Sequence, residues 1–328
     1  MTEPRSYHGQ PVIKAPVWSW EIPCYFYTGG LAGVSAGLAW GAGLRDNDVL
    51  ARRAYACSMT GLAVSPMLLI SDLGVPGRFL NMLRMFKLTS PMSVGTWILS
   101  ASGASTAVAA AHAWTGLFPR IATVARPLST LLGLPLATYT AALVSDTSVP
   151  VWHEARTELP FVFASGAALS AGAAATVLTP TEYAAPARRL ALAGAALELG
   201  SKRLMEHRLK DHGEPYKHGA GARLGWISNG CVAAGAALLA AKGGHSRVAA
   251  ATAGVLMSAG ALSARWSIFE AGSQSAADPK FVVGPQRERI ERGVSAGAAR
   301  TEPDVASSRR DDQARPQPLD PAPSVQES

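Results

Sequence analysis

Charged residues are scarce in this chain. Asp, Glu, Lys and Arg make up 16% of its 328 residues, whereas soluble domains usually carry about 25%. The formal net charge is +7, but the cations lie in predicted loops and tails, and no basic stripe is interleaved with aromatic residues. The composition therefore favours a protein embedded in the lipid membrane and disfavours one that binds nucleic acid.

Side chains that hold metal centres are equally few. The three cysteines, Cys24, Cys57 and Cys231, are scattered, and no CxxC occurs, so we expect no iron–sulfur cluster and no zinc site. Only His112 of the seven histidines lies plausibly within an apolar run. A haem b anchor needs pairs of such histidines as axial ligands. We therefore expect no haem, cluster or other metal in this chain.

Long apolar runs dominate the rest of the sequence. Eight of them lie at about 23–43, 54–71, 95–114, 123–145, 159–178, 186–204, 223–241 and 247–268. Most have the roughly 20 residues that a membrane-spanning helix needs. This pattern predicts an all-α integral membrane protein with about eight transmembrane helices in two four-helix bundles, 23–145 and 146–272. Residues 1–22 form a polar tail, and 273–328 are too polar to bury a core, which predicts a disordered tail.

The connection between the second and third runs, residues 72–95, is unusually long for a loop between packed helices. Its apolar side chains recur at helical spacing, which predicts a short amphipathic helix over 77–86 in the membrane interface. Pro91 closes the segment. A helix of this kind can also be a simple anchor without a ligand.

Polar groups of the first four runs gather at one membrane face, because successive spans alternate in direction. They are Glu21, Tyr25, Asp72 and Tyr139, with His153 just beyond the fourth run. Ionisable groups within a bilayer tend to mark paths for ions, protons or ligands. Glu198, inside the sixth run, is a further candidate.

Each of these residues also has a simpler interpretation. Tyr25 and Tyr139 could be interface tyrosines, and His153 an exposed loop residue. Asp72 could cap its helix or pair with Arg78, and Glu198 could form an i,i+4 ion pair with Lys202.

Three segments of the first half of the chain resemble the NrfD/PsrC family, the membrane subunits of polysulfide reductase-type molybdoenzyme complexes. They are WSWEIPCYFYTGGLAG at 18–33, DLGVPGRFLNMLRMFKLTSPMSVGTW at 72–97 and TYTAALVSDTSVPVWHEARTELPF at 138–161. The resemblance implies a multi-pass anchor in the cell membrane that binds a quinone and is not itself the catalytic centre. Its implied partners are an iron–sulfur electron-transfer subunit and a molybdopterin catalytic subunit.

The resemblance also implies roles for particular residues. Tyr139 falls where the family places a quinone-contacting tyrosine, and Tyr25 falls where polysulfide reductase has a histidine. We therefore expect a quinone site at Glu21, Tyr25, Asp72 and Tyr139, proton transfer at Asp72, His153 and Glu198, and partner docking at Arg78, Arg84, Lys87, Thr89, Ser90 and Pro91.

Several questions stay open from the sequence. The alternative function is a secondary transporter or proton channel, in which Asp72, Glu198 and the basic loops line a path. Membrane orientation, quinone type, the direction of electron flow, proton pumping and the terminal substrate of the complex are also open.

Overall fold

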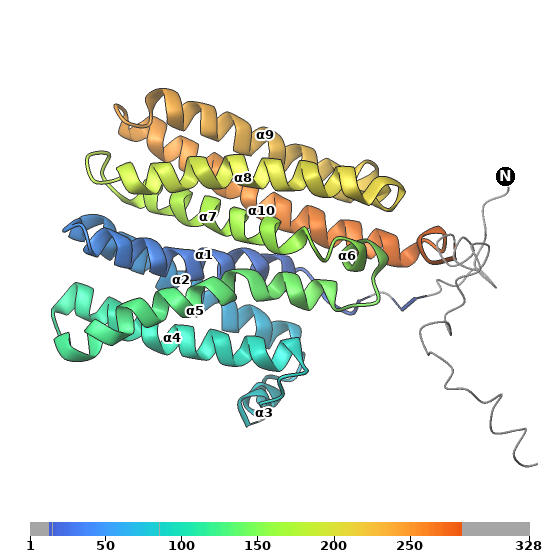
Figure 1. The fold of residues 1–328 in the computed structure, drawn as a ribbon, viewed down its shortest axis with the longest axis horizontal. Helices are drawn as coiled ribbons and strands as arrows, with labels where there is room; N and C mark the ends of the chain where they lie inside the picture. Colours follow the sequence, from blue (N-terminus) through green and yellow to red (C-terminus); the bar gives the residue numbers. More distant parts are fainter. Residues whose placement is uncertain (1–12, 15, 85, 284–328) are drawn as a thin grey trace, which may run out of the picture. The chain divides into compact units, whose positions relative to one another are not determined.

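The computed structural model describes residues 13–14, 16–84 and 86–283 (Figure 1). Most of both predicted tails lies outside this part of the chain, namely residues 1–12 of the first and 284–328 of the second. Residues 273–277, at the start of the predicted C-terminal tail, belong to the last helix.

Helices account for all the regular structure of the described residues. The long ones are α1 (Glu21–Gly43), α2 (Asp48–Asp72), α4 (Pro91–Thr115), α5 (Pro119–Ser145), α7 (Leu159–Leu178), α8 (Ala185–Leu209), α9 (Gly219–Lys242) and α10 (Arg247–Ala277). Short helical turns are η2 (Pro76–Arg78), α3 (Phe79–Arg84), α6 (Pro150–Glu154) and η3 (Lys210–Tyr216). The predicted all-α class is confirmed, and each predicted apolar run has its long helix.

Local sequence signals set several of the helix ends. Asn47 caps α2 by accepting a hydrogen bond from the Leu50 amide at 3.1 Å, and Ser246 caps α10 through the Ala249 amide at 3.2 Å. Gly116 ends α4 with a φ of 74°, a left-handed conformation that glycine adopts without strain.

Six of the long helices are long and apolar enough to cross a membrane: α2, α4, α5, α7, α9 and α10. α8 carries Glu198, Lys202 and several arginines, which lower its mean hydropathy. The predicted class of multi-pass membrane protein is supported, while the count of eight spans stays a prediction.

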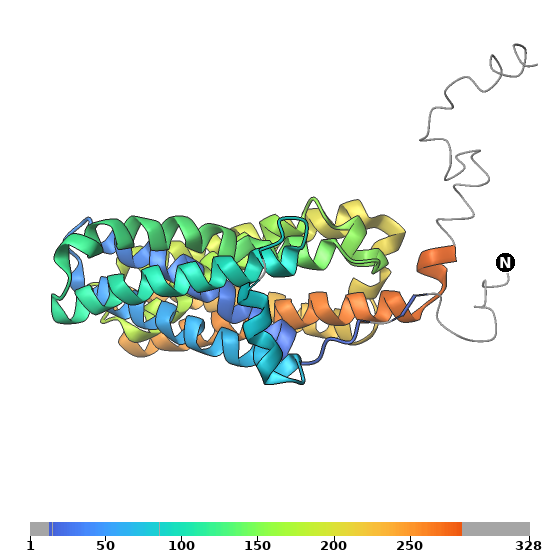
Figure 2. The same cartoon turned by 90° about the horizontal axis from the view of Figure 1, so that it is seen from below.

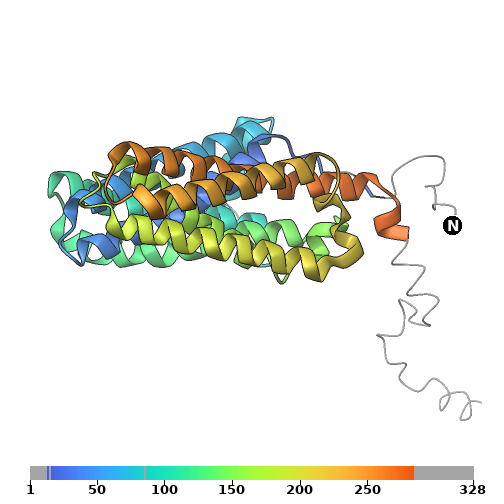
Figure 3. The same ribbon diagram turned by 90° about the horizontal axis from the view of Figure 1, so that it is seen from above.

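The long helices pack in two groups of four (Figure 1). In the first group α1 contacts α2, α4 and α5, and α4 contacts α2 and α5. In the second, α8 contacts α7 and α9, and α10 contacts α7 and α9. Contacts of α1, α2 and α5 with α7, and of α1 with α10, join the groups. Figure 2 shows α4 and α5 on one face of this assembly, and Figure 3 shows α8, α9 and α10 on the opposite face. Small residues allow close approach: a Cβ added to Gly33 of α1 would lie 2.2 Å from the Gly133 carbonyl oxygen of α5.

Candidate functional site

A small cavity lies at one end of the first group of helices, where α1 and α4 begin and α2 and α5 end. Its volume is about 60 Å³ and its lining is mainly apolar. Five helices contribute side chains to it, among them Tyr25 from α1, Asp72 from α2, Phe79 and Met82 from α3, Met92 and Thr96 from α4, and Tyr139 from α5. The structure therefore brings together three of the four residues expected at a quinone site.

The two tyrosines of the cavity lie against each other. The ring centroids of Tyr25 and Tyr139 are 6.4 Å apart and the rings meet edge to face. Tyr25 is buried, and its hydroxyl has no hydrogen-bond partner among the described residues. Buried hydroxyls nearly always have a partner, so this hydroxyl is available to a bound molecule.

Gly95 of α4 makes room for the Tyr139 ring. A Cβ added at Gly95 would lie 2.1 Å from Cε2 of that ring, well inside contact distance. The ring therefore packs directly on the backbone of α4, and any larger residue at this position would displace it.

Two carboxylates beside the cavity share one hydroxyl group. Ser19 Oγ lies 3.0 Å from Asp72 Oδ1 and also hydrogen-bonds Glu21 Oε2. The Ser71 hydroxyl donates to Glu21 Oε1 at 3.1 Å. Because Ser19 has a single hydroxyl proton, it can donate to only one carboxylate at a time. A proton taken up by either acid would satisfy the other contact, so Glu21, outside the cavity lining, is coupled to Asp72.

The local pair of Asp72 with Arg78, the simpler interpretation of this residue, is not formed among the described residues. Asp72 accepts hydrogen bonds from the hydroxyl and the backbone amide of Ser19. The Arg78 side chain is exposed and makes no ion pair with any residue that the structure describes. The residue that orients Asp72 is therefore Ser19, which lies in the first of the three family-like segments but is not among the residues expected at the site.

The predicted interfacial helix is present but shorter than expected. It consists of η2 and α3 and ends at Arg84, whereas the pattern predicted a helix to residue 86. Phe79 and Met82 of α3 line the cavity, so this segment covers the site. Arg84 and Lys87 are exposed beside it, and neither side chain has an ion-pair partner in the described part of the chain.

The Thr-Ser-Pro segment begins α4. Ser90 is the N-cap residue and accepts a hydrogen bond from the Ser93 amide at 3.4 Å, while Pro91 is the first helical residue. Thr89 is exposed. Capping explains the serine and proline locally, and the role of all three in partner docking stays a prediction.

His153 does not reach the cavity. It lies exposed on α6, with Nδ1 3.3 Å from the Ser145 carbonyl oxygen. Its neighbour Trp152 takes the buried position, stacks on Trp18 with ring centroids 5.6 Å apart, and donates from its indole to the Ile268 carbonyl at 2.8 Å. The site expected to include His153 therefore lacks it.

Glu198 lies in the second group of helices, apart from the cavity. It is fully buried, and neither carboxylate oxygen has a hydrogen-bond partner among the described residues. The ion pair with Lys202, the simpler interpretation of this spacing, is not formed at contact distance, because Lys202 Nζ donates to Ser228 Oγ at 3.0 Å and to Asn229 Oδ1 at 2.7 Å.

Arg265 of α10 is a neighbour of Glu198 that sequence spacing did not predict. A Cβ added at Gly166 would lie 2.5 Å from Arg265 Nη2 and 3.3 Å from Glu198 Cδ, so both groups meet over this glycine. Arg265 also donates to the Phe163 carbonyl at 2.9 Å and lies 4.2 Å from the centre of the Phe163 ring. The one signal in the sequence was a lone arginine within the eighth apolar run.

These features define a class of protein: a helical multi-pass membrane protein with a small tyrosine- and carboxylate-bearing cavity near one end of its first bundle. A family model described as polysulfide reductase (NrfD) matches residues 5–281. The chain therefore belongs to the polysulfide reductase family, which confirms the resemblance seen in the first half of the sequence. None of the curated proteins compared with the chain matches it.

Proposed function

We propose that this chain is the quinone-interacting membrane subunit of a molybdopterin and iron–sulfur oxidoreductase. Family membership supports the coarser role of a membrane anchor in a polysulfide reductase-like complex. The observation that carries the finer role is the convergence of Tyr25, Asp72 and Tyr139 from three helices on one apolar cavity. Such a cavity with a few polar groups suits a flat, largely apolar ring with two oxygens.

The residues of the cavity have separate roles in this proposal. The Tyr25 hydroxyl, which lacks a partner within the described chain, donates a hydrogen bond to one ring oxygen, and the Tyr139 hydroxyl donates to the other. Asp72, held by Ser19, accepts one of the two protons of a quinol, and Glu21, which is linked through the same hydroxyl, accepts the other. Oxidation of a quinol releases two protons and two electrons, so a nearby base and an electron acceptor are both required.

Entry of a ring requires side chains to move. The cavity of about 60 Å³ is smaller than usual ligand pockets of about 300 Å³ or more. Met82 and Met92 form part of its wall, and methionine side chains repack readily around a ligand. We infer that these two residues swing aside when the ring binds.

The electrons must pass to another chain, since the sequence has no cysteine set for a cluster. The exposed cations Arg78, Arg84 and Lys87 lie on and after the segment that covers the cavity. They form a docking surface for an iron–sulfur subunit, which in turn contacts the molybdopterin subunit. The catalytic subunit sets the terminal substrate.

We favour this function over a transporter or proton channel. The structure places Asp72 at the end of α2 and Glu198 within α8, and the cavity that Asp72 lines does not include Glu198. Glu198 remains a candidate proton carrier that serves the second bundle alone.

The test is the quinone-linked turnover of the assembled complex with Asp72→Asn. The amide keeps the shape of the side chain but cannot take up the proton, so we expect a loss of about tenfold or more. Asp46→Asn, in the exposed loop before α2, is the matched control and should retain parental activity. Electron transfer to an artificial acceptor at the catalytic subunit should stay unchanged. A quinone-linked rate within about twofold of the parent would show that Asp72 does not handle the proton.

A further inference from the structure

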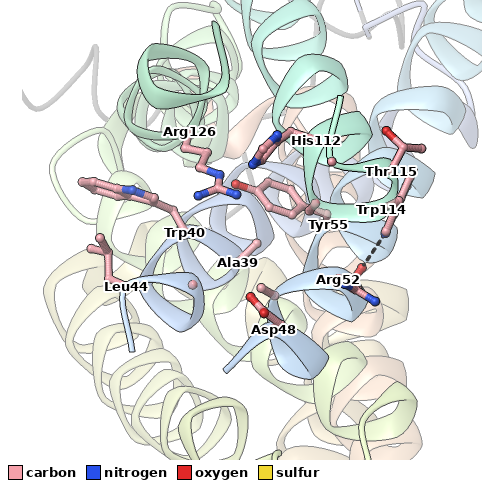
Figure 4. A pocket seen from close by; sticks show the side chains of 14 residues that line it. Ala39, Trp40, Leu44, Asp48, Arg52, Tyr55, His112, Trp114, Thr115 and Arg126 are labelled. Atoms are coloured by element: carbon pink, nitrogen blue, oxygen red, sulfur yellow. Dashed lines mark hydrogen bonds between the residues drawn. The ribbon is translucent and has the colours of Figure 1, made fainter. Parts of the chain in front are cut away.

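A second, larger cavity lies at the opposite end of the first bundle, where α1 and α4 end and α2 and α5 begin. Its volume is about 420 Å³. Figure 4 shows that its lining combines aromatic and basic side chains, including Trp40, Arg52, Tyr55, His112, Trp114 and Arg126. It shares no residue with the cavity of Tyr25 and Tyr139, so a ligand bound here occupies a separate site.

Two polar groups that face this cavity have no partner within the described chain. The Tyr55 side chain is 1% exposed, and its hydroxyl makes no hydrogen bond with a described residue. The Ser129 hydroxyl lies near this group, but it makes no hydrogen bond to it within 3.5 Å and donates its own proton to the Arg126 carbonyl at 2.8 Å. The Arg126 guanidinium pairs with no described carboxylate, although it lies close enough to act electrostatically on Tyr55.

In Figure 4 the Arg126 guanidinium and the Tyr55 hydroxyl point toward one another. A buried hydroxyl without a partner costs about 1–3 kcal/mol. A bound molecule with an acceptor oxygen between the two groups would remove that cost and would meet a positive charge as well.

The third polar group is the His112 imidazole, of which one ring nitrogen already has a hydrogen-bond partner. The Nδ1 atom of His112 lies 2.9 Å from the Leu117 carbonyl oxygen, which it can reach only as a donor. This contact holds the ring at the cavity wall and leaves Nε2 for another molecule. Figure 4 places the ring beside Tyr55.

The charges of the lining select an anion. The lining contains two arginines, Arg52 and Arg126, but a single carboxylate, Asp48. None of the ion pairs in the described structure joins Asp48 to either arginine. Guanidinium groups bind phosphate oxygens by paired, charge-assisted hydrogen bonds, so the positive excess suits a phosphate group.

The surroundings of the cavity are apolar. The exposed Leu44 is part of its lining, and Leu117, which directly follows the lining residue Gly116, is exposed as well. The exposed Trp114 donates from its indole to the Arg52 carbonyl at 3.3 Å. Tryptophan and arginine together at the ends of apolar helices are typical of the level of lipid headgroups. A free anion would gain nothing from this apolar rim, whereas acyl chains would pack against it.

We propose that this cavity binds the phosphate of an anionic phospholipid. The phosphate oxygens accept hydrogen bonds from Arg126 and the Tyr55 hydroxyl, Arg52 adds charge at the mouth, and the acyl chains lie along the exposed apolar faces of α4 and α5. Inorganic phosphate shares the recognition chemistry but lacks the chains.

The test uses the full chain in nanodiscs of phosphatidylcholine that contain a minor fraction of phosphatidylglycerol. Native mass spectrometry counts the phosphatidylglycerol that stays bound after release from the disc. Arg126→Gln should lower this retention about tenfold, the effect of losing a hydrogen-bonded charge. Arg53→Gln, which removes an exposed arginine on α2 outside the cavity lining, should leave it unchanged.

Tyr55→Phe is the second variant, because it keeps the ring and removes only the hydroxyl. It should lower retention by about fivefold, and it decides the question if Arg126→Gln does not fold. Equal retention by the parent, Arg126→Gln and Tyr55→Phe would overturn the proposal.

A second arm separates the two sources of phosphate. Inorganic phosphate is titrated in place of the lipid, and the unfolding temperature of the full chain in a neutral detergent is followed. The proposal predicts no shift from millimolar phosphate and a rise with phosphatidylglycerol that Arg126→Gln abolishes. A rise with inorganic phosphate as large as that with the lipid would overturn the lipid assignment in favour of a free-anion site.

Discussion

The candidate acids of the two helical bundles, Asp72 and Glu21 in the first and Glu198 in the second, are held in different ways. At the end of the first bundle, Asp72 and Glu21 are held by the hydroxyls of Ser19 and Ser71. In the second bundle, Glu198 is fully buried, and neither of its oxygens accepts a hydrogen bond from the described residues. Asp72 is partly exposed, whereas Glu198 lies near the buried cations Lys202 and Arg265.

This difference indicates that the first bundle carries the ligand site and that the second bundle has a structural role. A carboxylate at a helix end that is hydrogen-bonded to a hydroxyl can gain or lose a proton without leaving a buried charge uncompensated. Glu198 makes no ion pair within 4 Å in the described structure, but its charge is balanced by the nearby buried Lys202 and Arg265. Removing one charge from such a buried set is strongly destabilising. We therefore assign ligand chemistry to the first bundle and expect the largest stability effects in the second.

The largest predicted effect is in the second bundle. Arg265→Met removes the guanidinium beside Glu198 and should lower the free energy of unfolding by about 3–5 kcal/mol. The measurement is denaturant unfolding of the full chain in detergent, with Arg223→Met, an exposed arginine on α9, as the control. Combining Arg265→Met with Glu198→Leu should restore most of the loss. If Arg265→Met and Arg223→Met have the same free energy of unfolding, Glu198 does not depend on Arg265 and the proposed difference between the bundles is wrong.

The next effect tests how tightly the first cavity is built. Gly95→Ala places a methyl group 2.1 Å from the present position of the Tyr139 ring, so the ring must shift at a cost of about 1–3 kcal/mol. Gly103→Ala on the same helix meets nothing within 4 Å and should be neutral or slightly stabilising. Thermal unfolding and quinone-linked turnover should both fall for the first variant only, and equal behaviour of the two would show that the ring is not confined.

A smaller effect is expected at the surface beside that cavity. Charge reversal by Arg84→Glu together with Lys87→Glu should weaken recovery of the iron–sulfur subunit by roughly 1 kcal/mol. Arg53→Glu with Arg120→Glu, at the other end of the bundle, is the control pair. The difference should shrink at high salt, because exposed charges are screened. Equal recovery of both variants at low salt would place the interface elsewhere.

The smallest predicted effect is the pH dependence of stability that comes from Glu158, at the start of the second bundle. Burial raises the pKa of Glu158, but hydrogen bonds from Thr157 and Arg208 and the charge of Arg208 outweigh it, so the pKa lies below its ordinary 4.5. The pair, 2.8 Å apart, therefore stabilises the fold above pH 4.5, and this contribution is lost as pH falls through the lowered pKa.

Arg208→Gln tests this pair. The variant should be less stable than the parent at pH 7 by about 1 kcal/mol or less, since Arg208 is exposed. The difference should vanish as Glu158 becomes protonated. Thermal unfolding at pH 7 and at pH 3 measures it, and a deficit that persists at the lower pH would assign the effect to packing.

The sequence alone predicted the long helices and the convergence of Tyr25, Asp72 and Tyr139. Run length sets the helices, and the alternating direction of successive spans sends these three residues to one face. Those are properties of the chain order, so they need no knowledge of side-chain packing.

The side-chain contacts between helices could not be predicted from the sequence. The i,i+4 spacing of Glu198 and Lys202 predicted an ion pair, but Ser228 and Asn229 on α9 bind the lysine instead. His153 shares a short helix with Trp152, and only one face of that helix is buried. Which face turns inward depends on contacts with α10, and a local pattern does not encode them.

The central claim, that the cavity of the first bundle holds the quinone ring, is tested most directly by the affinity of a short-chain quinone. Binding to the full chain in nanodiscs is compared for the parent, Tyr139→Phe and Tyr183→Phe, whose tyrosine lies exposed in the loop before α8. The account predicts affinity about five- to hundredfold weaker for Tyr139→Phe, the value of a lost buried hydrogen bond of about 1–3 kcal/mol, and unchanged affinity for Tyr183→Phe. Affinities of all three within about twofold would contradict it.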